Sequence, residues 1–302
     1  MKHLISIKDL SREEIEEILE KSEEMALILK EEKNLDIMKG KILATLFFEP
    51  STRTKLSFTS AMQRLGGNVI GFEAVESLSV AKGENLTDTI RTIEKYSDIT
   101  VIRHPREGAA RYAAEISSKP VINAGDGTNQ HPSQTLLDLY SIKKLKGKIE
   151  NLNITLLGDL KHARVMKPLA YTLAMFKANL TFVSPLSLEF SKEVTDELKE
   201  KFNSKIIQTN DIYSGVKNAD VLYVCRIQKE RFADQYEAEK LEKAFRITPE
   251  IIEQANENMI ILHALPKVVE LDPKIDETKH AKYFEQAAYG IPVRMAILSM
   301  VS

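Results

Sequence analysis

The chain has 302 residues, with 42 Lys and Arg against 44 Asp and Glu, so its formal net charge is −2. This length predicts two domains, because a single hydrophobic core rarely grows past about 250–300 residues. No apolar stretch approaches the roughly 18–20 residues of a membrane span, and the charge balance lacks the basic surplus of a nucleic-acid binder, so both classes are excluded.

A helix is expected to open the chain, because Ser11 and Glu14 match a capping box ahead of an apolar stripe. Short apolar runs that predict buried strands follow, with helical patterns at residues 54–65 and 86–96 between them. The expected strands are residues 41–49, 68–73, 99–103 and 120–124. Strands that alternate with helices in this way predict right-handed crossovers and a largely parallel sheet.

A second alternation follows a predicted joining helix at residues 134–147. Its expected strands are residues 152–158, 180–184, 205–208, 221–225 and 259–263, and its clearest helices are 165–176 and 192–202. Residues 293–301 predict an amphipathic helix at the end of the chain. The fold class is therefore α/β, with two doubly wound parallel-sheet domains. Such pairs bind ligands in the cleft between them, at the carboxyl ends of strands.

The segment EPSTRT (residues 49–54) follows the first expected strand and precedes a helix. Backbone N–H groups, three hydroxyls and the Arg53 guanidinium at a helix N-terminus suit an anion, above all phosphate. An ordinary helix cap with a surface arginine explains the same residues equally well. No G-x-x-x-x-G-K-[ST] loop occurs in the chain.

Other polar residues follow strands at the same edges. Arg103 ends a strand, and His131 and Gln134 precede the joining helix, where they are placed to hydrogen-bond a carbonyl or carboxamide. Arg164, Arg226 and Gln228 follow strands of the second set, and two guanidinium groups there suit a dicarboxylate. The alternatives are a structural histidine, a solvated loop at residues 79–84, and a charged helix entry at residues 226–231.

Several chemistries find no support. The six histidines form no H-x-H or H-x-x-x-H pair, so no metal site is predicted. The turn that opens at Gly158 lacks G-x-G-x-x-G, which leaves a dinucleotide site weakly supported. The single cysteine, Cys225, is expected to be buried and inert. No signal-peptide pattern opens the sequence, and the protein is expected to be cytoplasmic.

Together these segments resemble the aspartate and ornithine carbamoyltransferase family along nearly the whole chain. The motifs that carry the resemblance are FFEPSTRT (47–54), SVAKGE (79–84), VIRHP (101–105), NAGDGTNQHPSQTLLDL (123–139), LLGDLKHAR (156–164), RIQKER (226–231), HALP (263–266) and YGIPVRMA (289–296). The lysine loop and R-x-Q-K-E-R are similar to the aspartate branch.

The resemblance implies transfer of a carbamoyl group from carbamoyl phosphate to the amine of L-aspartate, an early step of pyrimidine biosynthesis, with no cofactor. It implies that Arg53, Thr54, Lys82, Arg103 and His131 are catalytic. Carbamoyl phosphate would be bound by Ser51, Thr52, Arg53, Thr54, Arg103, His131 and Gln134. Aspartate would be bound by Lys82, Arg164, Arg226, Gln228 and the backbone at Leu265.

The resemblance also implies a homotrimer with shared active sites, in which Ser79 and Lys82 reach in from a neighbouring subunit. Glu49 would pair with Arg164 and Arg231 to hold the domains closed. A separate regulatory chain is a possible further partner. The implied domains are residues 1–133, which bind carbamoyl phosphate and are completed by the C-terminal helix 287–302, a linking helix 134–148, and an aspartate-binding domain 149–286.

The sequence departs from the family pattern at two positions. Ala264 stands where the aspartate branch has proline and the ornithine branch has cysteine, and His162 replaces a tyrosine. Three alternative functions stay open: another amine acceptor such as ornithine, a non-catalytic paralogue, and a dehydrogenase suggested by fold alone. Arg226 argues against ornithine, whose distal ammonium it would repel.

Overall fold

The computed structural model describes residues 1–31, 35–73 and 83–301 of the chain. These residues form two compact units. One unit comprises Met1–Tyr140 with Tyr289–Ser302, and the other comprises Ser141–Ala288. The chain therefore passes between the units twice, once within α5 (Pro132–Lys146) and once within α11 (Tyr283–Met300).

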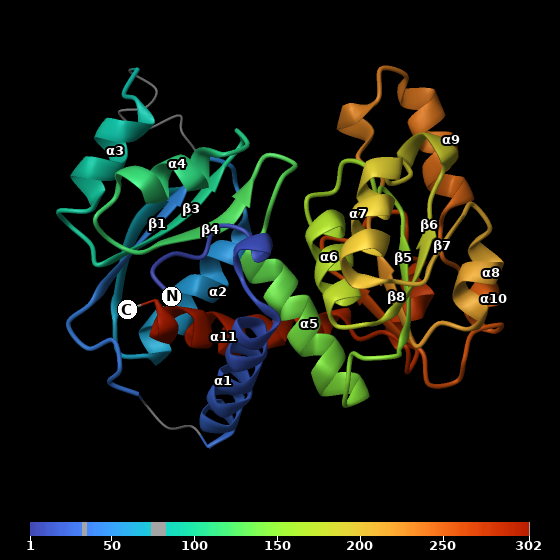
Figure 1. Cartoon of the computed structure of the whole chain (residues 1–302), viewed down its shortest axis with the longest axis horizontal. Coiled ribbons are helices and arrows are strands. Elements are labelled where there is room, and N and C mark those ends of the chain that lie inside the picture. The colour runs from blue at the N-terminus through green and yellow to red at the C-terminus, as the bar shows by residue number, and fades with distance from the viewer. Residues whose placement is uncertain (32–34, 74–82, 302) are drawn as a thin grey trace. The chain divides into compact units, whose positions relative to one another are not determined.

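The first unit contains a four-stranded parallel sheet in the order β2-β1-β3-β4. Its strands are β1 (Ile42–Phe47), β2 (Asn68–Glu73), β3 (Ile99–His104) and β4 (Val121–Asp126). Helix α2 (Thr52–Arg64) lies on one face, while α3 (Leu86–Ile93) and α4 (Ala109–Ile116) cover the other (Figure 1). The strand order reverses direction between β1 and β3, which makes their carboxyl ends the expected ligand site.

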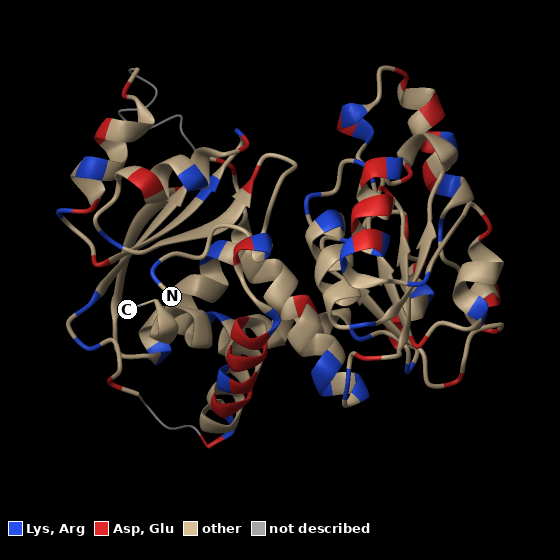
Figure 2. Ribbon diagram, in the orientation of Figure 1, with Lys and Arg blue, Asp and Glu red and all other residues tan. Residues whose placement is uncertain are grey.

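Helix α1 (Arg12–Lys30) opens the first unit, as the sequence predicts. The Ser11 hydroxyl accepts a hydrogen bond from the Glu14 backbone N–H, and the Glu14 carboxylate accepts one from the Ser11 N–H, so the predicted capping box is present. Ile15, Ile18 and Leu19 are buried, whereas glutamates line the outer surface of the helix (Figure 2).

The second unit contains a five-stranded parallel sheet in the order β7-β6-β5-β8-β9. Its strands are β5 (Asn153–Leu157), β6 (Asn179–Val183), β7 (Ile206–Thr209), β8 (Val221–Val224) and β9 (Ile260–His263). Helices α6 (Met166–Met175) and α7 (Lys192–Phe202) cover one face (Figure 1). The other face carries α8 (Ile212–Lys217), α9 (Gln235–Ala244) and α10 (Pro249–Ile252).

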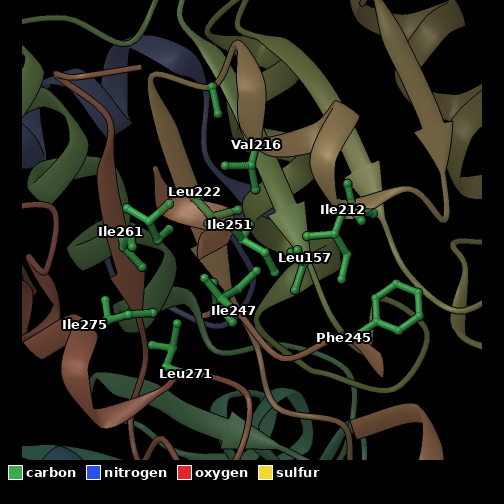
Figure 3. Close-up of a cluster of buried hydrophobic side chains, with 14 of the residues drawn as sticks. Leu157, Ile212, Val216, Leu222, Phe245, Ile247, Ile251, Ile261, Leu271 and Ile275 are labelled. Atoms are coloured by element: carbon green, nitrogen blue, oxygen red, sulfur yellow. The ribbon is translucent and has the colours of Figure 1, made fainter. Parts of the chain in front are cut away.

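Each sheet packs its helices onto an apolar core. In the second unit, Leu157, Val216, Leu222 and Ile261 belong to one buried cluster (Figure 3). In the first unit, Leu46 and Ile102 of the central strands pack with residues of α3 and α4. None of the helices within the described ranges is long and apolar enough to cross a membrane.

Two expectations from the sequence need correction, and one helix was missed. Strand β2 is not buried, because it lies at the sheet edge, where Ile70 is 37% exposed. The C-terminal segment is not amphipathic, because residues 293–298 of α11 are buried on all sides. Helix α4, with the alanine-rich sequence AARYAAEI, was not predicted.

Candidate active site

The predicted anion site lies at the N-terminus of α2, directly after β1. Ser51 is the N-cap residue, and its side chain makes no capping hydrogen bond, so the hydroxyl is not used to close the helix. Thr52 and Arg53 are exposed there, whereas Thr54 is buried. The Arg53 side chain is nonetheless partly desolvated by its surroundings, which lowers its pKa from the ordinary value. Hydroxyls, backbone N–H groups and a cation therefore gather where a helix dipole favours an anion.

A carboxylate already contacts this helix terminus. Oε1 of Glu73 accepts a hydrogen bond from the Ser51 backbone N–H at 3.0 Å, and Oε2 lies 3.4 Å from Nζ of Lys55. Glu73 ends β2, the strand next to β1 in the sheet. One donor of the predicted phosphate site is thus engaged by an anion of the protein itself.

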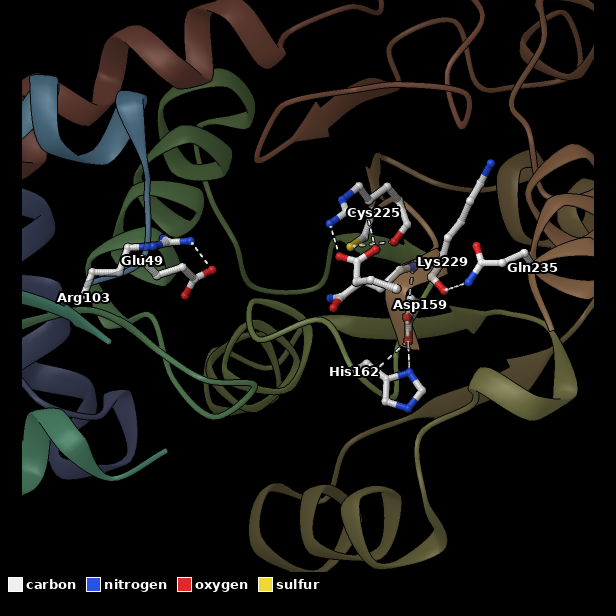
Figure 4. A network of polar contacts seen from close by, with 10 residues as sticks. Glu49, Arg103, Asp159, His162, Cys225, Lys229 and Gln235 are labelled. Carbon is white, nitrogen blue, oxygen red and sulfur yellow. Dashed lines mark hydrogen bonds and ion pairs between the residues drawn. The ribbon is translucent and has the colours of Figure 1, made fainter. Parts of the chain in front are cut away.

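Arg103 lies at the carboxyl end of β3, beside the end of β1. Its Nη2 donates to Oε1 of Glu49 at 3.2 Å, and its Nη1 donates to the Ala124 carbonyl at 3.3 Å. The Arg103 side chain is only 12% exposed, and Figure 4 shows its contact with Glu49. The guanidinium is therefore held between β1 and β4, at the switch point of the first sheet.

The loop before His131 is organised by a buried carboxylate that the sequence did not single out. Asp126, 1% exposed, organises the loop between β4 and α5. It accepts hydrogen bonds from Asn123 Nδ2, Gly108 N, Asn129 Nδ2 and Gln130 N. His131 follows this loop and is 5% exposed, with Nδ1 3.3 Å from the Ser133 hydroxyl. An aspartate between two glycines in GDG was the available signal.

Gln134 lies in the first turn of α5 and is 7% exposed. The first unit thus brings its predicted residues to the carboxyl end of one sheet. They are Ser51, Thr52, Arg53, Thr54, Arg103, His131 and Gln134. Ser79 and Lys82 lie outside the described residues, and their roles remain predictions.

The second unit has its own switch point, between β5 and β8. A cavity of about 150 Å³ opens there, lined by Arg164, Arg226, Gln228 and the turn that contains Leu265. The predicted aspartate-binding residues of this unit therefore share one pocket. Its cationic side chains are half-buried, which strengthens their attraction for an anion relative to open water.

Arg226 already holds a carboxylate in this pocket. Its Nη1 and Nη2 donate to the two carboxylate oxygens of Glu230, at 3.1 and 2.5 Å. This hydrogen bonding raises the pKa of Arg226. The bidentate geometry is the one by which a guanidinium recognises a substrate carboxylate.

Asp159 links the loop after β5 to the loop after β8. It is fully buried after β5 and accepts hydrogen bonds from the backbone N–H groups of His162 (2.9 Å) and Gln228 (3.3 Å). Nδ1 of His162 also lies 3.3 Å from its carboxylate (Figure 4). The histidine that departs from the family pattern is therefore tied into the turn that leads to Arg164.

The turn at residues 263–266 is held by its own histidine. Nδ1 of His263 accepts a hydrogen bond from the Leu265 N–H at 2.8 Å, and Nε2 lies 2.9 Å from Oε1 of the buried Glu270. Leu265 has a left-handed backbone with φ of 58°. Side-chain contacts thus hold this turn in a chain that has alanine at position 264.

The sequence also predicts roles for Glu49 and Cys225. Glu49 pairs with Arg103 inside the first unit, and its predicted pairing with Arg164 and Arg231 stays a prediction.

Cys225 follows β8, and burial raises its thiol pKa, which fits the expected inert role. Within the described ranges, no group of three His, Cys, Asp or Glu side chains is arranged to hold a metal ion.

Comparison with known families agrees with this arrangement. The family model described as aspartate/ornithine carbamoyltransferase, carbamoyl-P binding domain, matches residues 2–144, and the Asp/Orn binding domain of the same family matches residues 150–301. The chain belongs to the aspartate/ornithine carbamoyltransferase family.

Among its relatives, the aspartate carbamoyltransferase catalytic subunit of Thermococcus kodakarensis is 54% identical, over 98% of this chain and 96% of the relative. That of Archaeoglobus fulgidus is 52% identical, over 100% and 99%. The solved catalytic subunit of M. jannaschii aspartate transcarbamoylase has a TM-score of 0.94 at 51% identity, over 100% and 98%. The enzyme from Trypanosoma cruzi, solved with N-(phosphonacetyl)-L-aspartic acid, also scores 0.94, at 36% identity over 99% and 95%.

Proposed function

We propose that this protein transfers the carbamoyl group of carbamoyl phosphate to the amine of L-aspartate, giving N-carbamoyl-L-aspartate and phosphate. In this proposal the first unit binds carbamoyl phosphate and the second binds aspartate. The domain limits predicted from sequence, at residues 133–134, 148–149 and 286–287, are part of it. Support comes from the family and from relatives and solved structures that are themselves aspartate transcarbamoylases.

The chemistry needs no nucleophile from the protein. The neutral amine attacks the carbamoyl carbon, a C–N bond forms, and the C–O bond to phosphate breaks. The departing phosphate takes up the amine proton. Negative charge develops on the carbonyl oxygen, and the account assigns its stabilisation to Arg53, Arg103 and His131, which are fixed before the reaction begins. Glu49 holds Arg103 in place for that role, and Asp126 organises the loop that leads to His131.

The observation that carries the choice of amine is the bidentate pair between Arg226 and Glu230. It shows that the guanidinium of Arg226 is oriented to bind a carboxylate. An amino-acid substrate would need a side-chain carboxylate, in addition to its α-carboxylate, to use this group. Aspartate offers that second carboxylate, whereas ornithine offers an ammonium group, which Arg226 would repel.

The assembly and location predicted from sequence belong to the same proposal. We infer a homotrimer in which Lys82 and Ser79 complete a neighbouring site, and a regulatory chain as a possible partner. The word "catalytic subunit" in the names of relatives supports an oligomer. A cytoplasmic location is supported by the single cysteine, since a reducing compartment suits a chain that cannot form an internal disulfide.

The direct test is product formation by the purified chain from carbamoyl phosphate with L-aspartate, beside parallel reactions with L-ornithine and with no amine. We expect carbamoylated product with aspartate alone. Product with ornithine instead of aspartate would overturn the assignment of the second unit, and product with neither would overturn the reaction.

A further inference from the structure

Gln134 contacts a buried acid whose role the reaction described so far leaves open. Gln134 and Asp138 lie one turn apart on the same face of α5. Nε2 of Gln134 donates a hydrogen bond to Oδ1 of Asp138 at 2.8 Å, and Asp138 is 0% exposed. The pair lies inside the first unit, next to the proposed carbamoyl phosphate site.

This contact fixes which way the glutamine amide faces. An ionised carboxylate only accepts hydrogen bonds, so the NH₂ end of Gln134 must face Asp138. The carbonyl oxygen Oε1 then faces away from the acid, where it is an acceptor for a ligand. A protonated Asp138 would be able to donate to Oε1 and so reverse the amide.

Arg294 is a buried cation whose charge interacts with that of Asp138. It is 3% exposed in α11, with Nη1 donating to the Gly290 carbonyl at 3.1 Å and the guanidinium 5.2 Å from the ring centre of Phe58. Burial lowers the pKa of Arg294 to about 10, and the charge of Asp138 opposes that fall.

The fold makes room for this arginine. A methyl group added at Gly290 would lie 2.3 Å from Nη1 of Arg294. A fully buried acid that is hydrogen-bonded to a substrate-binding amide one turn away is a costly arrangement, which stability alone does not require.

We propose that Asp138 is a positioning residue that fixes the amide of Gln134 and thereby selects a ligand whose carbonyl carries an amino group. This inference rests on the proposed function, because it takes carbamoyl phosphate as the ligand of the first unit. It adds the source of discrimination between carbamoyl phosphate and an acyl phosphate of the same shape.

Acetyl phosphate is the matched probe, because a methyl group that cannot donate replaces the amino group. The measurement is the ratio of the inhibition constant of acetyl phosphate to the KM of carbamoyl phosphate, from initial rates with aspartate. We expect a ratio of about tenfold in the wild type, worth one hydrogen bond. Asp138→Asn should bring the ratio to within about twofold of unity, chiefly through the KM of carbamoyl phosphate.

Two further variants separate positioning from mere stability. Gln134→Met removes the amide but leaves Asp138 and Arg294, and should lose the same discrimination. The exchanged variant Gln134→Glu/Asp138→Asn restores one acid and one amide, so a carboxylate oxygen still accepts from the ligand. We expect it to recover a ratio within about threefold of the wild type. An Asp138 that only stabilised the fold would raise both constants together and would not be rescued by a change at position 134.

Each outcome decides between a positioning role and a purely stabilising role of Asp138. If Asp138→Asn does not fold, the exchanged variant, which keeps one acid near Arg294, decides by itself: a ratio near unity contradicts the proposal. A wild type that discriminates no better than Asp138→Asn also overturns it. A wild type that forms no carbamoyl-aspartate marks failure of the proposed function instead.

Discussion

Two carboxylates of the protein lie where the proposed substrates bring their own anionic groups. Glu73 accepts a hydrogen bond from the backbone N–H of Ser51, and Glu230 binds Arg226 through both oxygens. Both contacts use donors that the proposal assigns to substrate. At the scale of single residues, substrate binding is therefore an exchange of one carboxylate or phosphate for another, and these glutamates set part of the apparent affinity.

Glu73→Gln should tighten binding of carbamoyl phosphate. The substitution removes a negative charge from the N-terminus of α2, where it opposes the incoming phosphate. We expect the KM of carbamoyl phosphate to fall by about two- to fivefold, with the KM of aspartate unchanged. Steady-state kinetics at low ionic strength measures both constants.

The control for that experiment is Glu115→Gln, which removes an exposed carboxylate from α4. An equal fall in KM for both variants would assign the effect to net charge rather than to the α2 terminus. A higher KM in Glu73→Gln would contradict the account.

The positions of single site residues were predicted well from the sequence. Ser51, Arg103 and His131 lie at the predicted sheet edge because parallel strands end at the same edge, and chain order alone gives that relation. The carboxylates Glu73, which bonds to Ser51, and Asp126, which organises the loop before His131, were not predicted, because hydrogen-bond partners depend on loop paths and strand neighbours that periodicity does not encode.

At the scale of elements, the turn after β9 depends on a buried histidine–glutamate pair. Glu270 is 5% exposed and accepts hydrogen bonds from the N–H groups of Val268 and Val269, besides contacting His263. Burial raises the pKa of Glu270, but the hydrogen bond from His263, together with these N–H groups, lowers it below its ordinary value of 4.5. A depressed pKa contributes stability that is present above 4.5 and is lost as the pH falls through the folded value.

Glu270→Gln should therefore cost the most stability near neutral pH. We expect the free energy of unfolding to drop by about 1–3 kcal/mol at pH 7, with the gap to wild type narrowing below pH about 4.5. Urea unfolding at several pH values measures the gap. Glu253→Gln, at an exposed position, is the control. A gap that stays constant down to the acid transition would rule out this role for the ionised carboxylate.

A second element-level feature is the close approach of β5 to β8 beside the pocket. Gly158 has φ of 122°, and an added Cβ would lie 2.0 Å from the Cys225 carbonyl oxygen. Gly147, after α5, also has a positive φ, of 76°, but no atom lies within 4 Å of an added Cβ. Substitutions at Gly158 and Gly147 therefore distinguish the cost of backbone strain, which both share, from the cost of a steric clash, which only Gly158 has.

Gly158→Ala should thus destabilise the protein more than Gly147→Ala. Backbone conformation alone costs about 1 kcal/mol at either site, and displacement of a packed strand end adds about 1–3 kcal/mol at Gly158. Thermal or urea unfolding of the two variants provides the comparison. Equal losses would show that the strand ends separate freely at this point.

At the scale of the whole molecule, the alternation of strands and helices predicted both parallel sheets. It did not predict strand order, so the apolar segment NVIGFE was assigned a buried strand although β2 lies at an edge. Residues 293–301 were predicted to form an amphipathic helix, yet the fold buries even Arg294, beside Phe58. Both errors arise because burial is decided by long-range packing rather than by local pattern.

The account divides the two substrates between the two units, and Arg226 tests that division most directly. Arg226→Ala is measured by steady-state kinetics with each substrate varied at a saturating level of the other. We predict that the KM of aspartate rises at least about tenfold, through loss of a bidentate carboxylate contact, while the KM of carbamoyl phosphate stays within about twofold. Equal increases in the two constants would contradict the account.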